Sequence, residues 1–419
     1  MRYAVSTDGH AAAAASLADS LRAQWDAVPT GGLYSYPARL APSAAELLLQ
    51  ELPRGTLLDP FCGSGTTLVE ALRTGRRATG SDASPLALFV AAHRTWRPDK
   101  RCADELWESA VEATREDSAT ARRPRSWAAL AKAVTRVEAT QRWPGRGESC
   151  EAARLAPLSF CLAAAMQRSE RHKLSGNAAV DVIGLFRSVA REYVETLRAA
   201  PEPDGAYGAL LLHSDARRLE LPSGSVDALL TSPPYPGVYD YLSVAREARV
   251  RLSPGDGRGG RRSSRAPAGR RSGGGLRDPP ASTEEAAAGS LPRHAQHESR
   301  VMGLAAVPSG RDWPTGWRSD WEMGARKAMR RDPQSFGAAW QRDQGLWLGA
   351  ARRSMRPGAR AAVVIGDGGG IDTLDSTRRA AEAVGMRVVA CASIRSDLPV
   401  EERLQGNRRT EHALLLEAP

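Results

Sequence analysis

The first hundred residues alternate between short apolar runs and stretches with helical spacing. Residues 56–58 form an apolar run of strand length, and Leu68 and Leu72 then recur with the period of a helix, which predicts a helix from Thr66 to Arg73. Residues 78–80 then lead into a second predicted strand, which ends at Asp82. This order of elements predicts a strand–helix–strand unit, which is typical of a parallel sheet.

The same alternation returns in the second half of the chain. Apolar runs of strand length occur at residues 209–213, 228–231, 361–365, 386–394 and 411–417. Helical spacing is found at residues 342–355 and 376–384. This repeated alternation predicts an α/β fold with a doubly wound, mostly parallel sheet of seven strands and helices on both faces. The last two strands are joined by a polar loop, which is compatible with an antiparallel pair at the sheet edge.

Two segments interrupt the alternation. Residues 99–205 are helix-forming throughout, and because a strand–helix–strand unit needs only about 30 residues, they predict an inserted helical subdomain. Residues 253–312 are rich in Gly, Arg, Pro and Ser, and such a composition buries too little apolar surface to order the chain, so partial disorder is expected. The remaining divisions are an N-terminal extension and three parts of the sheet domain: 1–30, 31–98, 206–252 and 313–419.

Charge points to a polyanionic partner. The 419 residues carry a formal net charge of +10. Residues 246–300 hold 12 arginines and 6 acidic residues, so this one segment supplies more than half of the excess. A basic surface is the electrostatic footprint expected of a nucleic-acid-binding protein, although many arginine-rich proteins bind none. The segment therefore favours either a phosphate-binding role or a solvated linker.

The cysteines and the apolar runs exclude other classes of protein. The five cysteines are odd in number and contain no C-x-x-C pair, so neither a disulfide framework nor a metal site is expected. No apolar run reaches the roughly 18 residues of a membrane span, and the N-terminus is a poor match to a signal peptide. We therefore expect a cytoplasmic protein with no metal and no membrane partner, and its oligomeric state stays open.

A glycine turn follows the first strand. The sequence from Asp59 to Thr67 reads Asp-Pro-Phe-Cys-Gly-Ser-Gly-Thr-Thr, so an acid ends the strand and glycines precede the next helix. Gly63 and Gly65 allow a close approach of backbone to ligand and a positive φ. The N-terminus of the helix adds unpaired N–H groups that suit a carboxylate or phosphate. The turn lacks the Gly-Lys-Ser/Thr ending of a phosphate-binding P-loop and the spacing of a dinucleotide-binding motif.

Two further acids end strands of the same predicted sheet. Asp82 follows Gly65 by 17 residues, a spacing at which an acid accepts hydrogen bonds from ribose hydroxyls. Asp215 follows the next core strand. All three acids are expected at the carboxyl edge of the sheet, where ligands of such folds bind. For Asp215 a plain turn cap remains the alternative.

A rigid loop follows the strand at residues 228–231. It reads Ser232-Pro233-Pro234-Tyr235, and the two prolines fix φ and remove two backbone donors. The carbonyls of such a loop have no helix or sheet partner and can face a substrate. Tyr235 adds an aromatic face and Ser232 an acceptor oxygen.

Together these motifs resemble the DNA amino-methyltransferases, which make N4-methylcytosine or N6-methyladenine. Tyr36-Pro37-Ala38-Arg39 is similar to the segment before the cofactor loop in that family. The resemblance covers roughly residues 30–98, 207–246 and 315–417 and implies a class I methyltransferase fold with S-adenosylmethionine as cofactor. It implies cofactor contacts from Asp59, Phe61, Gly63, Gly65, Thr66, Asp82 and Asp215. It implies that the catalytic loop consists of Ser232, Pro233, Pro234 and Tyr235.

The implied reaction is direct methyl transfer to an amino group of a flipped-out base, with N4 of cytosine favoured over N6 of adenine. In this hypothesis Ser232 and the Pro233 carbonyl accept the two amine hydrogens. A restriction endonuclease is a possible partner, and one of the two insertions is expected to read the target. Two alternatives remain: an RNA base amino-methyltransferase, for example acting on guanine N2, and a non-catalytic nucleic-acid-binding protein on the same scaffold.

Several other residues have two interpretations. Cys62 lies in the glycine turn, but without a preceding proline it is expected to be a small buried residue and not a nucleophile. Tyr239 and Tyr241 are candidates for a base pocket or for the core. Trp313, Trp317 and Trp321 recur every four residues, which favours a core-facing helix over a stacking platform.

Overall fold

The structure of the chain is a computed structural model. It describes residues 3–27, 32–36, 40–115, 124, 126–143, 155–174, 180–200, 208–240, 322–396 and 410–419. The segment at 253–312, the tryptophans at 313–321 and Tyr241 lie outside the described residues, as do residues 37–39. No described helix is both long and apolar enough to cross a membrane.

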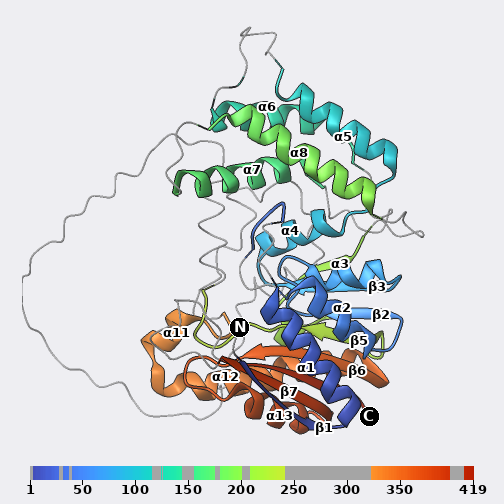
Figure 1. Cartoon of the computed structure of the whole chain (residues 1–419), viewed down its shortest axis with the longest axis vertical. Coiled ribbons are helices and arrows are strands. Elements are labelled where there is room, and N and C mark those ends of the chain that lie inside the picture. The colour runs from blue at the N-terminus through green and yellow to red at the C-terminus, as the bar shows by residue number, and fades with distance from the viewer. Residues whose placement is uncertain are drawn as a thin grey trace, which may run out of the picture.

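The described residues form one sheet of eight strands in the order β1-β7-β8-β6-β5-β2-β3-β4 (Figure 1). The strands are β1 Tyr3–Gly9, β2 Thr56–Asp59, β3 Arg77–Asp82, β4 Leu210–His213, β5 Val226–Thr231, β6 Met355–Gly366, β7 Arg387–Ser396 and β8 Thr410–Glu417. Strands β2 to β6 pair in parallel, and β8 is antiparallel to both β6 and β7. The predicted doubly wound, mostly parallel α/β fold is confirmed. The predicted antiparallel pair, β7 and β8, is present, but β8 lies inside the sheet.

The sheet has one strand more than the seven predicted, because the N-terminus joins it. β1 pairs antiparallel with β7 along its whole length, from Tyr3 opposite Ser396 to Gly9 opposite Ala390. α1 (Ala11–Asp26) then packs on β1, β7 and α2 (Pro42–Gln50) through a buried stripe that includes Leu17 and Leu21. Residues 3–26, expected as part of an extension, are thus an edge strand and a covering helix.

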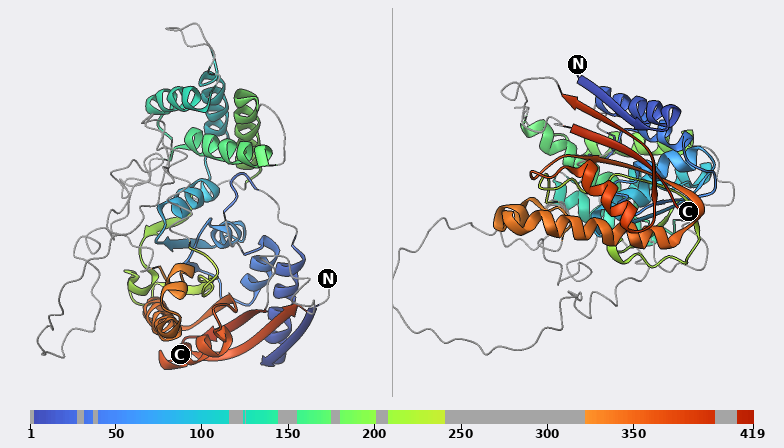
Figure 2. Two further views of the ribbon diagram at one scale, coloured as in Figure 1. Left: turned by 90° about the vertical axis from the view of Figure 1, so that its left-hand side faces the viewer. Right: turned by 90° about the horizontal axis from the view of Figure 1, so that it is seen from below.

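Helices cover both faces of the sheet, as predicted (Figure 2). Alternate residues of each strand point to opposite faces, and they enter two separate apolar cores. Leu57 joins the core under α1, α2, α3 (Thr66–Arg73) and α4 (Pro85–Thr95), whereas Leu58 joins the core under α12 (Pro333–Ser354) and α13 (Thr373–Ala383). A short helix, α11 (Arg326–Arg331), precedes α12.

Within its described residues, the predicted helical insertion contains four helices, which lie at one end of the molecule beyond α4 (Figure 1). They are α5 Lys100–Glu112, α6 Trp127–Thr140, α7 Pro157–Leu174 and α8 Val182–Ala199. They share the larger core with the sheet domain, where the His93 ring stacks on Phe160 at 4.8 Å between centroids and the Tyr193 hydroxyl donates to the His93 carbonyl. Burial lowers the pKa of His93 to about 4, so the ring is neutral and structural, joining α4 to the insertion.

Candidate active site

Two loops meet at the carboxyl edge of the sheet. β2 and β5 are parallel neighbours, and the strand order runs through β3 and β4 on one side and through β6 on the other. Ligands of doubly wound folds bind at such a switch point. The Thr231 hydroxyl, one residue before Ser232, donates a 2.6 Å hydrogen bond to Asp59 Oδ1, 172 residues away in sequence. This bond places the end of β5, where the Ser-Pro-Pro-Tyr loop begins, beside the end of β2, where the glycine turn begins.

The glycine turn has the backbone geometry that its sequence predicts. Gly63 and Gly65 have φ of +49° and +77°, in the left-handed region that side chains disfavour. The Gly63 N–H donates to Asp82 Oδ2 at 2.9 Å, which fixes the turn to the end of β3. A Cβ on Gly65 would lie 3.0 Å from Ala91 Cβ on α4. The turn therefore needs glycine at Gly65 both for conformation and for space.

Arg94 of α4 holds this turn by hydrogen bonds. No motif in the sequence indicates this residue. Its Nη1 donates to the Ser64 carbonyl at 2.8 Å, to Ser64 Oγ at 2.9 Å and to Thr66 Oγ1 at 3.1 Å. Phe61, on the other side, packs edge-on to Trp347 of α12 with 5.3 Å between centroids. Both predicted cofactor residues, Phe61 and Thr66, thus have structural contacts, and their cofactor roles stay predictions.

Two carboxylates end the neighbouring strands β2 and β3. Asp59 is buried and accepts from the Thr231 hydroxyl and from the Phe61 N–H at 3.1 Å. Asp82 is partly buried and accepts from the Gly63 and Ser84 N–H groups. Burial raises the pKa of each to about 6. Because each carboxylate oxygen has two lone pairs, both acids retain capacity to accept hydrogen bonds from hydroxyl or ammonium groups once ionised.

These pKa values predict that affinity for S-adenosylmethionine rises with pH through about 6. At pH about 5 a carboxyl with a pKa of about 6 is roughly one-tenth ionised, so each required carboxylate, Asp59 or Asp82, weakens binding roughly tenfold relative to pH about 7. Isothermal titration across this range measures the effect. The Asp82→Asn variant should bind more weakly at pH about 7 and show a shallower profile. A flat profile in the parent protein would contradict the assignment.

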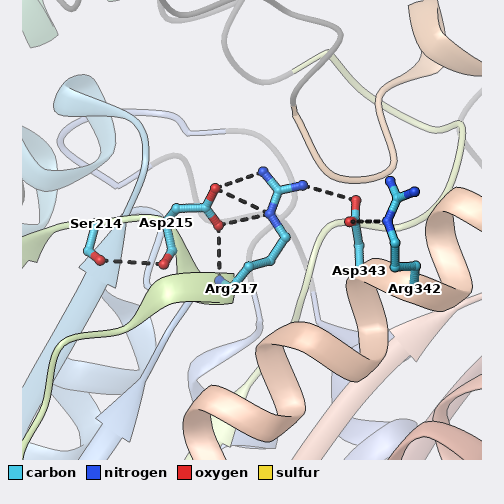
Figure 3. A network of polar contacts seen from close by, with 5 residues as sticks. All are labelled: Ser214, Asp215, Arg217, Arg342 and Asp343. Carbon is cyan, nitrogen blue, oxygen red and sulfur yellow. Dashed lines mark hydrogen bonds and ion pairs between the residues drawn. The ribbon is translucent and has the colours of Figure 1, made fainter. Parts of the chain in front are cut away.

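The third predicted cofactor acid, Asp215, forms an ion pair with an arginine (Figure 3). Arg217 Nη2 reaches Asp215 Oδ2 at 2.7 Å, and the Arg217 N–H donates to Oδ1 at 2.9 Å, which caps the turn at Ala216–Arg218. Arg217 Nη1 also bonds Asp343 of α12 at 3.1 Å. Burial alone disfavours the charged guanidinium, but the two carboxylates outweigh it and raise the pKa of Arg217. The capping alternative for Asp215 is therefore present in the structure, and a cofactor role stays a prediction.

The Ser-Pro-Pro-Tyr loop leaves β5 at the same edge. Ser232 is half-buried, Pro233 is buried, and Tyr235 is half-buried. The Tyr235 ring packs against the end of β6 so closely that a Cβ on Gly366 would lie 2.6 Å from its Cε2 atom. This close contact holds the aromatic ring where the loop passes the sheet edge.

Sequence reasoning missed the group that anchors Tyr235. Its hydroxyl donates to Glu411 Oε1 of β8 at 3.1 Å, and Trp25 Nε1 of α1 donates to Glu411 Oε2 at 2.8 Å. Glu411 is 2% exposed. A buried carboxylate without hydrogen-bond donors is costly, so Glu411 beside apolar β8 residues was a sequence signal for such a partner. The N-terminal helix thereby supports the loop.

This anchor predicts coupled effects of mutation. Tyr235→Phe removes a hydrogen bond to a buried carboxylate and should lower the free energy of unfolding by about 1–3 kcal/mol. In a Glu411→Gln background the same change should cost clearly less, because the charged acceptor is already gone. Urea unfolding of the parent, the two single variants and the double variant completes the cycle. Fully additive losses would show that the two side chains do not interact energetically.

The segment before the turn is held by the helical insertion. Gln167 of α7 accepts from the Ser35 N–H at 2.7 Å and donates to the Ser35 carbonyl at 2.8 Å, as a paired strand would. The next residue, Tyr36, is buried, and its ring lies 3.6 Å from where a Cβ on Gly63 would be. The insertion therefore reaches the glycine turn indirectly: Gln167 binds Ser35, and the adjacent Tyr36 lies against Gly63.

Two further observations concern the described residues. Cys62 is 5% exposed, and burial raises the pKa of its thiol well above the ordinary value, which suits the predicted small buried residue. Among the residues that the structure places, no group of three or more His, Cys, Asp or Glu side chains is arranged to hold a metal ion.

Comparison with known proteins agrees with this site. Residues 34–142, which include Tyr36, the glycine turn and Asp82, match the model of the family described as "UPF0020: RMKL-like, methyltransferase domain". Residues 34–142 are thus similar to a methyltransferase domain. The matched family differs from the DNA amino-methyltransferases that the motifs resemble, so the finer assignment to DNA is not supported. A search of curated proteins finds no match.

Two solved structures show a distant likeness. The rRNA methyltransferase aviRa from Streptomyces viridochromogenes is 15% identical, with a TM-score of 0.31 over 92% of this chain and 89% of its own. TrmN from Thermus thermophilus is 12% identical, with a TM-score of 0.32 over 91% of this chain and 50% of its own. At these TM-scores neither substrate can be transferred to this chain from the likeness.

Proposed function

We propose that this methyltransferase transfers a methyl group from S-adenosylmethionine to an exocyclic amino group of a nucleic-acid base. The observation that carries the proposal is the hydrogen bond from Thr231 to Asp59. It joins the end of β5 to the end of β2, so the loop with an acceptor serine and an aromatic ring opens beside the glycine turn. A donor group and an acceptor amine held in these two loops would be neighbours.

The residues of the turn fit the cofactor in chemical type. Gly63 and Gly65 allow close backbone approach, and Asp59 and Asp82 supply carboxylates for ammonium and hydroxyl groups. When bound, S-adenosylmethionine supplies a methyl group on a positively charged sulfur. The chain itself would hold the ammonium and ribose ends and keep the two carboxylates ionised near neutral pH.

The serine loop would prepare the amine for attack. A base amino group donates its lone pair into the ring and is a poor nucleophile. Ser232 Oγ and the Pro233 carbonyl are the acceptors proposed for its two hydrogens, which would free the lone pair for a new N–C bond while the S–C bond breaks. One of the two protons then leaves to solvent. Holding the reacting atoms in attack geometry is worth about 7–11 kcal/mol, so positioning can carry most of the rate.

RNA is the first substrate to test, and duplex DNA is the second. The matched family is not the DNA amino-methyltransferase family, which removes the priority that the motifs alone gave to DNA. An unpaired base in RNA also avoids the few kcal/mol needed to flip a base from a duplex. The Ser-Pro-Pro-Tyr motif keeps DNA as a candidate. We do not propose a restriction endonuclease as partner, because the comparisons give no support to a restriction–modification role.

The test is transfer of a labelled methyl group. The full chain is incubated with methyl-labelled S-adenosylmethionine and either total RNA or duplex genomic DNA, and the nucleic acid is digested to nucleosides. We expect the label in an amino-methylated base from RNA. Label only in DNA would support the second candidate. Label in neither nucleic acid would end the proposal, whether or not the cofactor binds.

A further inference from the structure

A short basic helix lies next to the Ser-Pro-Pro-Tyr loop. The sequence of α11 is Arg-Lys-Ala-Met-Arg-Arg, and its four basic side chains are all exposed: Arg326, Lys327, Arg330 and Arg331. At about 100° per residue they occupy an arc of roughly 140° on the helix. Ala328 and Met329 occupy the rest. The helix therefore has one cationic side and one short apolar side.

The apolar side of α11 is fixed to the loop that follows Tyr235. Met329 packs so tightly on Gly237 that a Cβ there would lie 2.5 Å from its Sδ atom. The Gly237 N–H donates to the Gly324 carbonyl at 2.8 Å, just before the helix. The orientation of the cationic side is thus set by the same loop that carries the proposed catalytic residues.

Two more bonds join the first turn of α11 to this loop. The Arg326 N–H donates to the Tyr239 carbonyl at 3.2 Å, and the Lys327 N–H donates to Asp240 Oδ1 at 2.9 Å. Tyr239 itself is 37% exposed, one of two large hydrophobic side chains in the described residues with an exposed surface. Tyr239 thus adds an exposed aromatic ring on a residue whose backbone binds the first turn of the basic helix, and proteins that bind unpaired nucleic acid combine these two features.

The acidic residues nearby reduce this charge only in part. The side chain of Asp240 is 9% exposed and lies 3.9 Å from Arg326. Asp332 accepts from the Ser335 N–H at 3.1 Å and caps α12. The hydrogen bonds from Ser335 and, to a lesser extent, the nearby charge of Arg331 lower the pKa of Asp332. Arg330 lies about one turn along the helix from Arg326, the side chain near Asp240. Both Arg330 and Arg331 are exposed on the cationic side of the helix.

We propose that α11 and Tyr239 form the surface that holds an unpaired nucleic-acid strand beside the active site. The basic side chains bind the phosphates that flank the target, and Tyr239 stacks on a neighbouring unpaired base. The inference rests on the proposed function. It assigns phosphate contacts to α11, whereas the sequence alone suggested the glycine- and arginine-rich segment at residues 253–312.

Paired double variants test the phosphate contacts. Arg330→Gln with Arg331→Gln removes two charges from α11. Arg54→Gln with Arg77→Gln removes two exposed charges next to the starts of β2 and β3, at the opposite edge of the sheet. Binding to a fluorescein-labelled single-stranded RNA of mixed sequence is measured by anisotropy from about 50 to about 200 mM salt. The full chain is used for all proteins.

The α11 double variant should bind roughly five- to tenfold more weakly for each phosphate that its helix no longer neutralises. The slope of the logarithm of the binding constant against the logarithm of the salt concentration should become shallower by about 0.7 for each such phosphate. The control double variant should remain close to the parent. Equal affinities and slopes for the two double variants would overturn the proposal, because the effect would then be one of net charge.

Variants of Tyr239 distinguish the binding of an unpaired strand from the binding of a duplex. Tyr239→Ala removes the stacking ring and should weaken single-stranded binding by roughly five- to a hundredfold, and Tyr239→Phe should restore it. Duplex DNA of the same sequence should be little affected. Equal weakening on both nucleic acids would overturn the assignment to an unpaired strand. Since binding is measured without catalysis, failure of methyl transfer would reject the proposed function and leave this result interpretable.

Discussion

Replacing Ser232 with alanine should lower turnover about 100-fold or more and leave S-adenosylmethionine affinity nearly unchanged. In the proposed reaction Ser232 Oγ accepts a hydrogen bond from the amine in the transition state, and the loss of one such positioned hydrogen bond costs about 10²–10³ in rate. The carboxylates and glycines assigned to the cofactor lie in another loop, so its affinity should not depend on Ser232. Single-turnover methyl transfer and calorimetric cofactor titration measure the two quantities.

A matched serine controls for general effects of the substitution. Ser225 lies at the other end of β5, where its hydroxyl donates to the Pro222 carbonyl at 2.7 Å. Ser225→Ala should leave turnover intact. If Ser232→Ala and Ser225→Ala have equal rates, Ser232 takes no part in the reaction. Loss of cofactor affinity in Ser232→Ala would instead place that residue in the cofactor site.

Local sequence signals predicted the centre of the fold well. The turn at Gly63 and Gly65 precedes α3 where the sequence placed it, because a positive φ favours glycine and so leaves a clear signal in the sequence. Asp59 and Asp82 lie at strand ends, as the sequence predicted. A buried acid is costly unless hydrogen-bond donors meet it, and at these strand ends the Thr231 hydroxyl and the Gly63 N–H do so. The strands that carry them are parallel neighbours.

The missed parts depend on contacts between distant segments. β1 has a mostly exposed burial pattern and pairs with β7 almost 390 residues later, so neither its composition nor its surroundings in sequence identify it. Trp25 and Glu411 are 386 residues apart, and their bond exists only because α1 lies on β7 and β8. For Asp215 the sequence left a cofactor contact and a turn cap open, and the structure shows the cap together with an ion pair to Arg217. The spacing of a motif does not show which hydrogen-bond donors surround an acid in the folded chain.

The substrate class was the least determined part of the sequence interpretation. The glycine turn and the serine loop are local features that depend on backbone geometry and on a few polar atoms, so their residue types alone predict methyl transfer to an amine. The choice between DNA and RNA depends on surfaces that contact phosphates and neighbouring bases, and α11 had no recognised motif. Methyl transfer was therefore predictable from the sequence, and recognition of the substrate was not.

Gly65→Ala should destabilise the chain by about 2–5 kcal/mol and weaken cofactor binding at least about tenfold. An alanine at φ +77° costs about 1–2 kcal/mol, and its Cβ would lie 3.0 Å from Ala91 Cβ and 3.2 Å from Ala91 Cα, where overpacking adds about 1–3 kcal/mol. Both Ala91 atoms are fixed to the backbone of α4, so relief requires the turn or the helix to move. The same shift would displace the Gly63 N–H from Asp82.

Gly75→Ala provides the control because it shares the strain and lacks the close neighbour. Its φ is +72°, and a Cβ there would meet nothing within 4 Å. It should cost only about 1–2 kcal/mol, with cofactor affinity unchanged. Thermal unfolding and cofactor titration of the two variants separate conformation from crowding. Equal losses of stability would mean that α4 yields to the added methyl group, and cofactor affinity that survived in Gly65→Ala would remove the turn from the cofactor site.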